Sequence, residues 1–251
     1  SDLPLALEKV PFAYPSITVS FGGVLPPSEA EAQGPQFSLQ SGKLHLRYTE
    51  TGAFTLDKKG LIHAMSASDP PTPFFYRFVG MNMTALLLAM RGRLVLHGST
   101  VTVPSGQALI VGRSGAGKSS LSLALHQSGF PLVCDDISVI RAASRVSVER
   151  GVPYLKAFGD SLAALDLSSE DVDRLTEHGL KRRVPFTPDA ANLPLRAIYV
   201  LDTSTKVSVR RLSFSESFTA LTHHTFLPRS LDLLGLQRTH FSNLQNLLRH
   251  V

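Results

Sequence analysis

The stretch with the clearest potential for chemistry is Gly112–Ser119, whose residues match the pattern GxxxxGKS. An apolar run, Ala108–Val111, precedes it, and Ser119–His126 has the pattern of a helix. Glycines in such a loop adopt backbone angles that side chains forbid and let N–H groups approach phosphates closely. Lys118 would neutralise the β and γ phosphates, and Ser119 would bind Mg²⁺. The pattern predicts a Walker A loop that binds ATP and Mg²⁺ through Gly112, Ser114, Gly115, Ala116, Gly117, Lys118, Ser119 and Ser120.

Two adjacent carboxylates, Asp135 and Asp136, follow the next apolar strand, Phe130–Cys134. In α/β folds this strand can lie beside the strand of the phosphate loop, so that its carboxyl end faces the phosphates. One carboxylate could then hold Mg²⁺ while the other accepts a proton from an attacking hydroxyl. The alternative is a pair of surface aspartates in a turn. We expect Asp135 and Asp136 to complete a phosphoryl-transfer site.

Basic and imidazole groups flank this core on both sides in the sequence. His97 ends a strand just before the phosphate-loop strand, where it could contact phosphate or an acceptor. The cluster Lys181-Arg182-Arg183 could place a guanidinium on the transferred phosphoryl group. A solvated basic surface is an equally good interpretation of that cluster. We carry His97 as a catalytic candidate and Arg182 and Arg183 as nucleotide-binding candidates.

The residues before the core have the alternating pattern of short strands. We expect an N-terminal β-rich module over residues 1–73, which ends at the stiff connector Asp69–Pro73. His45 and His63 fall on its strands, and a structural role is expected for both. The predicted strands span 17–21, 43–48, 53–56 and 61–65, with a polar loop at 26–36.

Residues 74–251 are predicted to form the kinase domain, which opens with an apolar helix over 74–90 that packs across a sheet. From Arg93 onward, strands and helices alternate as in an α/β fold. Predicted strands cover 94–97, 100–103, 108–111, 130–134, 138–141, 145–148, 195–201 (buried) and 207–212. Predicted helices cover 119–126, 160–165, 169–178, a segment that opens at Ser213 with Glu216 at capping-box spacing, and 231 onward.

Composition narrows the classes of function. The 251 residues are 43% hydrophobic, enough for a sizeable core, and no apolar run is long enough to span a membrane. The single cysteine, Cys134, excludes an internal disulfide, and no secretion signal is visible, so we expect a cytoplasmic protein. A net charge of +5 permits nucleic-acid binding, but no recognition motif accompanies it. We expect neither nucleic acid nor membrane as a partner. The sequence stops within a helical pattern, so the natural chain is expected to extend further.

The segments LHGSTVTV, ALIVGRSGAGKSSLSLAL and SGFPLVCDDISVIR together resemble the core of HPr kinase/phosphorylase. The resemblance covers about residues 94–141. It implies an α/β fold with a P-loop core of the HPr kinase and phosphoenolpyruvate carboxykinase type, which moves phosphate from ATP to a protein serine. By resemblance, Lys118 would hold the β and γ phosphates, and Ser119 and Asp136 the Mg²⁺. Asp135 would take the serine proton, and His97 would lie near the phosphoryl group.

The segments after the core depart from the HPr kinase signature. VPYLKAFGDSLAAL, KRRVPF and LPLRAIYVLD look more like HPr-kinase-related proteins of lasso-peptide pathways. That resemblance implies a ribosomal precursor peptide as the acceptor, which the N-terminal module could bind, and it admits a homo-oligomer. The alternatives are an HPr-type carrier protein, a small hydroxylated metabolite such as serine, and a nucleotide-binding switch that transfers no phosphate.

Overall fold

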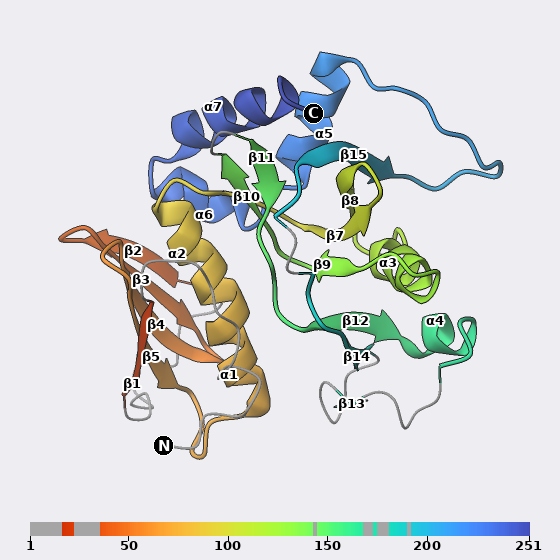
Figure 1. Ribbon diagram of the computed structural model, residues 1–251. Helices are drawn as coiled ribbons and strands as arrows, with labels where there is room; N and C mark the ends of the chain where they lie inside the picture. The colour runs from red at the N-terminus through yellow and green to blue at the C-terminus, as the bar shows by residue number, and fades with distance from the viewer. Residues whose placement is uncertain (1–16, 23–35, 143–144, 168–172, 175–180, 190–191) are drawn as a thin grey trace. The chain divides into compact units, whose positions relative to one another are not determined.

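The computed structural model describes residues 17–22, 36–142, 145–167, 173–174, 181–189 and 192–251 (Figure 1). They form two compact units of mixed α/β structure, which confirms the predicted class. The sheet unit comprises the described residues up to Gly92 together with Leu227–Thr239, and the loop unit comprises Arg93–Phe226 and His240–Val251. The division falls after Gly92, whereas the predicted domain boundary lies at Pro73.

The sheet unit is built on one five-stranded sheet with the order β1-β5-β4-β3-β2. Strand β1 runs parallel to β5, and every other pair is antiparallel. Four strands lie where the alternating pattern predicts them, whereas β2 was not predicted. Most of the predicted loop over 26–36 lies outside the described residues. The strands are β1 (Thr18–Phe21), β2 (Gln36–Gln40), β3 (Lys43–Tyr48), β4 (Gly52–Asp57) and β5 (Leu61–Ser66).

The predicted helix over residues 74–90 is present and packs on this sheet, as Figure 1 shows in yellow. It runs as α1 (Pro73–Phe78), a π-helical turn η2 (Val79–Met83) and α2 (Thr84–Met90). The Thr72 side chain accepts a hydrogen bond from the N–H of Phe75 and caps its start. Helix residues at intervals of three and four share one apolar core with the strands, and this core places the helix in the sheet unit. Its largest fully buried members are Leu44, Phe54, Leu56, Ile62, Phe75, Met83, Leu86 and Leu87.

Both histidines of the sheet unit have a hydroxyl partner on the neighbouring strand. The ring of His45 shares a hydrogen bond of 3.0 Å with Thr55, and the ring of His63 one of 2.9 Å with Ser20. Each pair is directly cross-strand in the register. This is the structural role expected for both.

The loop unit is organised around a four-stranded sheet with the order β15-β8-β7-β9. Strand β15 runs parallel to β8, and β7 runs antiparallel to both β8 and β9. A second sheet has the order β11-β10-β6. The strands are β6 (Leu94–Leu96), β7 (Gly98–Val103), β8 (Gly106–Gly112), β9 (Leu132–Cys134), β10 (Ser138–Ala142), β11 (Val146–Val148) and β15 (Leu195–Leu201).

The strand that ends at the two aspartates does not pair with the strand of the phosphate loop, as the sequence had led us to expect. Strand β7 lies between β8 and β9. Since β7 is antiparallel to both, β8 and β9 point the same way and their carboxyl ends meet at one edge of the sheet. The amino end of β7 lies at that same edge, where Gly98 pairs with Val111.

Helix α3 (Lys118–Gln127) packs between this sheet and a small sheet of order β12-β14-β13. The remaining elements are β12 (Tyr154–Phe158), α4 (Gly159–Ala163), β13 (Asp173–Arg174), β14 (Lys181–Pro185), α5 (Phe214–His223), α6 (Pro228–Leu233) and α7 (Gln237–Leu248). None of the helices in the described part of the chain is long and apolar enough to span a membrane.

Three predicted elements differ from the structure. Residues 207–212 form no strand and belong to the long light-blue excursion in Figure 1, where the exposed Val207 and Val209 cover no apolar surface. The predicted helix over 169–178 falls partly outside the described residues, and its described pair Asp173–Arg174 is a strand. The C-terminal helix breaks at Gly235, whose φ is +63°. The strand predicted as buried, β15, is an edge strand with Tyr199 half exposed.

Candidate phosphoryl-transfer site

The phosphate loop connects β8 to α3, as its sequence pattern predicts. Gly115 and Gly117 have φ of +83° and +90°, values that strain any residue with a side chain. The Arg113, Ser114 and Gly115 positions are exposed, so the crest of the loop is open to an incoming anion. Lys118, the first residue of α3, is buried and donates to the carbonyl oxygens of Gly112 at 2.9 Å and Arg113 at 3.1 Å.

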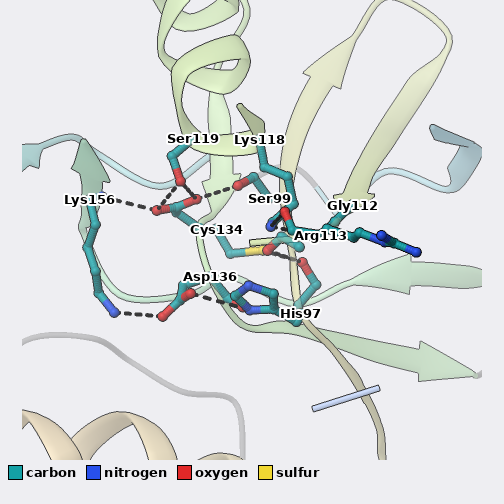
Figure 2. A network of polar contacts seen from close by, with 12 residues as sticks. His97, Ser99, Gly112, Arg113, Lys118, Ser119, Cys134, Asp136 and Lys156 are labelled. Atoms are coloured by element: carbon teal, nitrogen blue, oxygen red, sulfur yellow. Dashed lines mark hydrogen bonds and ion pairs between the residues drawn. The ribbon is translucent and has the colours of Figure 1, made fainter. Parts of the chain in front are cut away.

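The first turn of α3 carries two serines with different partners. The Ser119 hydroxyl donates to Asp135 Oδ1 at 3.1 Å and lies 3.4 Å from Oδ2 (Figure 2). The Ser120 hydroxyl lies 2.7 Å from that of Ser161 in α4. Ser119 therefore joins the loop to the carboxylates, whereas the Ser120 hydroxyl holds α3 against α4 and has only its backbone to offer a nucleotide.

Asp135 is buried, with 3% of its surface exposed, and it is surrounded by donors. Besides Ser119, the Ser99 hydroxyl donates to Oδ1, and the backbone N–H of Lys156 donates to Oδ2 at 3.0 Å. Burial raises the pKa of Asp135, and the hydrogen bonds from Ser99 and Lys156 oppose that rise. This carboxylate faces the phosphate loop and has little access to solvent.

Asp136 has a different environment. Its φ of +68° places it in the left-handed region, which aspartate tolerates better than most residues. Its carboxylate contacts His97 Nδ1 through Oδ1 at 3.3 Å and Lys156 Nζ through Oδ2 at 2.6 Å, and 29% of the side chain is exposed. Both contacts are visible in Figure 2. Asp136 is thus held at both oxygens and remains reachable from solvent.

His97 lies between β6 and β7, at the same edge of the sheet as the aspartates. Its Nδ1 is 3.0 Å from the carbonyl oxygen of Asp136 as well as 3.3 Å from the carboxylate. Since both partners only accept, the ring carries its hydrogen on Nδ1 and presents Nε2 as an acceptor. Burial lowers the pKa of His97, and the Asp136 carboxylate opposes this. Gly98 follows because a Cβ there would come within 2.7 Å of the Ile110 carbonyl oxygen.

Three residues of this site were not singled out by the sequence pattern: Ser99, Lys156 and His224. The backbone N–H of His97 donates to the His224 carbonyl oxygen at 2.7 Å. Burial lowers the pKa of His224, and the positive charge of Lys118 lowers it further. The three residues lie 36, 20 and 88 positions from Asp136 or Asp135 along the chain at most, so only pairing between strands and helices brings them together.

Of the two candidate arginines, only one lies on the side of β14 that concerns the aspartates. Arg183 pairs directly with Lys156 on β12, and its guanidinium carbon lies 5.6 Å from the centre of the Tyr154 ring. Directly paired residues share a face of the sheet, so Arg183 lies on the face of Lys156. Arg182 pairs with the buried Ala157 and lies on the opposite face.

The donor set fits a magnesium ion held together with phosphate oxygens. Mg²⁺ prefers hard oxygen ligands and is commonly bound by one or two carboxylates plus substrate phosphates and water. Ser119 and Asp135 offer a hydroxyl and a carboxylate at the mouth of the phosphate loop. Among the described residues, no group of three or more His, Cys, Asp or Glu side chains forms a separate metal cluster.

Comparison with known proteins gives one weak structural likeness. No protein-family model matches the chain, and no curated protein matches it. Among solved structures, the HPr(Ser) kinase/phosphatase from Coxiella burnetii matches at 22% identity over 38% of this chain and 86% of its own, with a TM-score of 0.25. This neighbour carries the name of the family that the motifs resemble. Because the TM-score is low, the function is inferred below from the geometry of the site itself.

Proposed function

We propose that this protein is an ATP-dependent kinase that transfers the γ-phosphoryl group to a serine hydroxyl of a peptide or protein. The observation that carries the proposal is the hydrogen bond from Ser119 to Asp135. It unites the phosphate loop and the carboxylate pair in one site, although 16 positions separate the two residues. A loop that binds nucleotide without transferring phosphate has no need of a second, reachable carboxylate beside it.

The contacts favour a division of roles that is the reverse of the one implied by the sequence resemblance. Ser119 and Asp135 would hold Mg²⁺, because their oxygens already lie together and the buried Asp135 is out of reach of a peptide. Bound there, Mg²⁺ would supply positive charge against the β and γ phosphate oxygens. Asp136, which the resemblance had assigned to the metal, becomes the better candidate for the proton acceptor.

In the proposed step, the acceptor serine gives its hydroxyl proton to the Asp136 carboxylate as its oxygen attacks the γ phosphorus. The bond between that phosphorus and the β,γ-bridging oxygen breaks, and ADP leaves. Lys118 turns from the carbonyl oxygens of Gly112 and Arg113 to the phosphates and neutralises developing charge. The Asp136 oxygens are already oriented by His97 and Lys156, which reduces the reorganisation needed at the moment of transfer.

We further propose that the acceptor is a ribosomal precursor peptide of the lasso type. The support is the resemblance of residues 152–165, 181–186 and 193–202 to kinases of those pathways. An HPr-type carrier protein is the alternative acceptor. Both would be met in the cytoplasm, where ATP and Mg²⁺ are present.

The test is transfer of label from γ-phosphate-labelled ATP to a synthetic library of serine-containing peptides, to free serine and to an HPr-type carrier protein, read by mass spectrometry. We expect a peptide or protein to gain one phosphoryl group on serine. Asp136→Asn should lower turnover by about 10²- to 10⁴-fold while Mg-ATP still binds. Asp232→Asn, at an exposed site in α6, is the matched control and should be neutral. Hydrolysis of ATP with no transfer to any acceptor would contradict the proposal and support the switch.

A further inference from the structure

One residue touches both aspartates of the candidate site. Lys156 donates its backbone N–H to Asp135 Oδ2 at 3.0 Å and its ammonium to Asp136 Oδ2 at 2.6 Å. Figure 2 shows the two contacts side by side, with the lysine side chain running along the pair. The backbone contact belongs to the strand and survives any substitution except proline, whereas the ammonium contact belongs to the side chain alone.

The alternation of β12 explains why this lysine points at the site. Its neighbours Leu155 and Ala157 are buried in the core beneath α3. The residue between them must point to the other face of the strand. On that face Tyr154 is buried under the guanidinium of Arg183, and it confines the lysine stem from one side. The side chain of Lys156 is 23% exposed, so its course is defined by packing as well as by charge.

Asp136 depends on such an anchor because its backbone is in a strained conformation. A left-handed φ in a residue with a side chain costs roughly 1 kcal/mol, so the turn persists only if its surroundings hold it. His97 holds the carbonyl oxygen and Oδ1, which leaves Oδ2 to Lys156. Without the ammonium the carboxylate could rotate about its Cα–Cβ and Cβ–Cγ bonds while keeping the His97 contact.

We infer that Lys156 is a positioning residue, which aims the Asp136 carboxylate at the acceptor hydroxyl. The inference rests on the proposed function, and it assigns Lys156 no contact with the nucleotide. Loss of the ammonium should therefore slow transfer without weakening the binding of Mg-ATP. A purely structural role would instead lower stability and affect all steps together.

The decisive variant is Lys156→Met, which keeps the stem of the side chain and removes the charge. We expect kcat to fall by about 10- to 100-fold, with the KM for ATP and the Kd for a fluorescent ATP analogue unchanged. Lys156→Arg should retain most of the activity because a guanidinium also reaches the carboxylate. Lys206→Met, at an exposed position of the same unit, is the matched control and should leave kcat as in the wild type.

Chemical rescue separates a positional effect from misfolding. In Lys156→Cys, alkylation of the introduced thiol with 2-bromoethylamine releases bromide and forms a thioether that ends in an ammonium at nearly the length of lysine. The native Cys134 is fully buried and its pKa is raised to about 11, so it stays unreacted in the folded protein. We expect alkylation to restore kcat at least tenfold over the untreated variant.

The outcomes distinguish this inference from the proposed function. Full activity of Lys156→Met overturns the positioning role and leaves the kinase intact. A kcat that neither Lys156→Arg nor alkylation restores, or a loss of ATP-analogue binding, overturns it as well. Failure of the wild-type protein to phosphorylate any acceptor overturns both.

Discussion

The two units of this protein treat buried polar groups in opposite ways. In the sheet unit the helix and sheet share a core of aliphatic and aromatic side chains, and the polar His45 and His63 lie on the other face with hydroxyl partners. In the loop unit Lys118 and Asp135 are both buried, and they are the buried charged residues of the described chain. Burying a charge costs stability unless it is paired and hydrogen-bonded. A unit that bears this cost beside a phosphate loop uses those groups for chemistry.

The contrast also holds within the site. Asp135 is enclosed by three donors and faces the phosphate loop, whereas Asp136 is partly exposed and held by an imidazole and an ammonium. Two adjacent residues of the same type thus occupy environments suited to different tasks. Neighbouring carboxylates with separated environments are a recurring arrangement in enzymes that need one acid group for binding and another for proton transfer.

The largest effect should come from Asp135→Asn. Activity should fall by about 10³-fold or more, because the group that holds charge opposite the phosphates is lost. Stability should change by no more than about 1 kcal/mol, because an amide of the same shape is less costly to bury than a carboxylate. Turnover and thermal unfolding of the same preparation check both parts. A large drop in stability with activity retained would show that Asp135 serves the fold instead.

The complementary change in the sheet unit is Phe54→Ala, in which a ring that is 1% exposed is removed from the apolar core. We expect a loss of about 3–5 kcal/mol in the free energy of unfolding, measured by urea denaturation. Turnover per folded molecule should be unchanged, since the contacts described above for the two aspartates come from the loop unit. Phe74→Ala, at a half-exposed ring on the same helix, is the control and should cost far less.

A smaller effect is expected from Ser99→Ala, which removes the hydroxyl that donates to Asp135. The carboxylate then loses one of its buried donors, at a cost of about 1–3 kcal/mol in stability, and we expect a moderate fall in turnover as well. Thr55→Ala removes the hydroxyl partner of His45 on the solvent side of the sheet unit and should cost less than 1 kcal/mol. Equal losses for the two variants, by thermal or urea unfolding, would remove the distinction between the two units.

The smallest effect should come from the capping box of α5, which lies away from both cores. The backbone N–H and hydroxyl of Ser213 lower the pKa of Glu216 to about 2. Because this pKa lies below that of the unfolded chain, the stabilisation is complete above about pH 4.5 and is lost as pH falls toward 2. Glu216→Gln should therefore lower the melting temperature slightly at pH 7 and not at pH 2. A difference that is the same at both pH values would exclude the charge as its source.

Local patterns predicted most of the elements that surround the site. Gly112–Ser119 forms the turn between a strand and a helix because its glycines and its apolar flanks are local properties of the chain. The Ser213 and Glu216 capping box is local in the same way. Residues 207–212 show the limit of this reasoning. Their alternation is typical of a strand, but a strand needs a partner, and none of the described strands pairs with them.

The amino-acid sequence by itself determined the phosphate loop, the adjacent aspartates and the mixed α/β class, because each depends on residue types that are close together along the chain. Tertiary structure alone decided which carboxylate meets Ser119, that β7 separates β8 from β9, and that Lys156 reaches both aspartates. These features depend on strand order, register and the direction of side chains. Such properties arise from contacts between residues that are distant in sequence, and no local pattern encodes them.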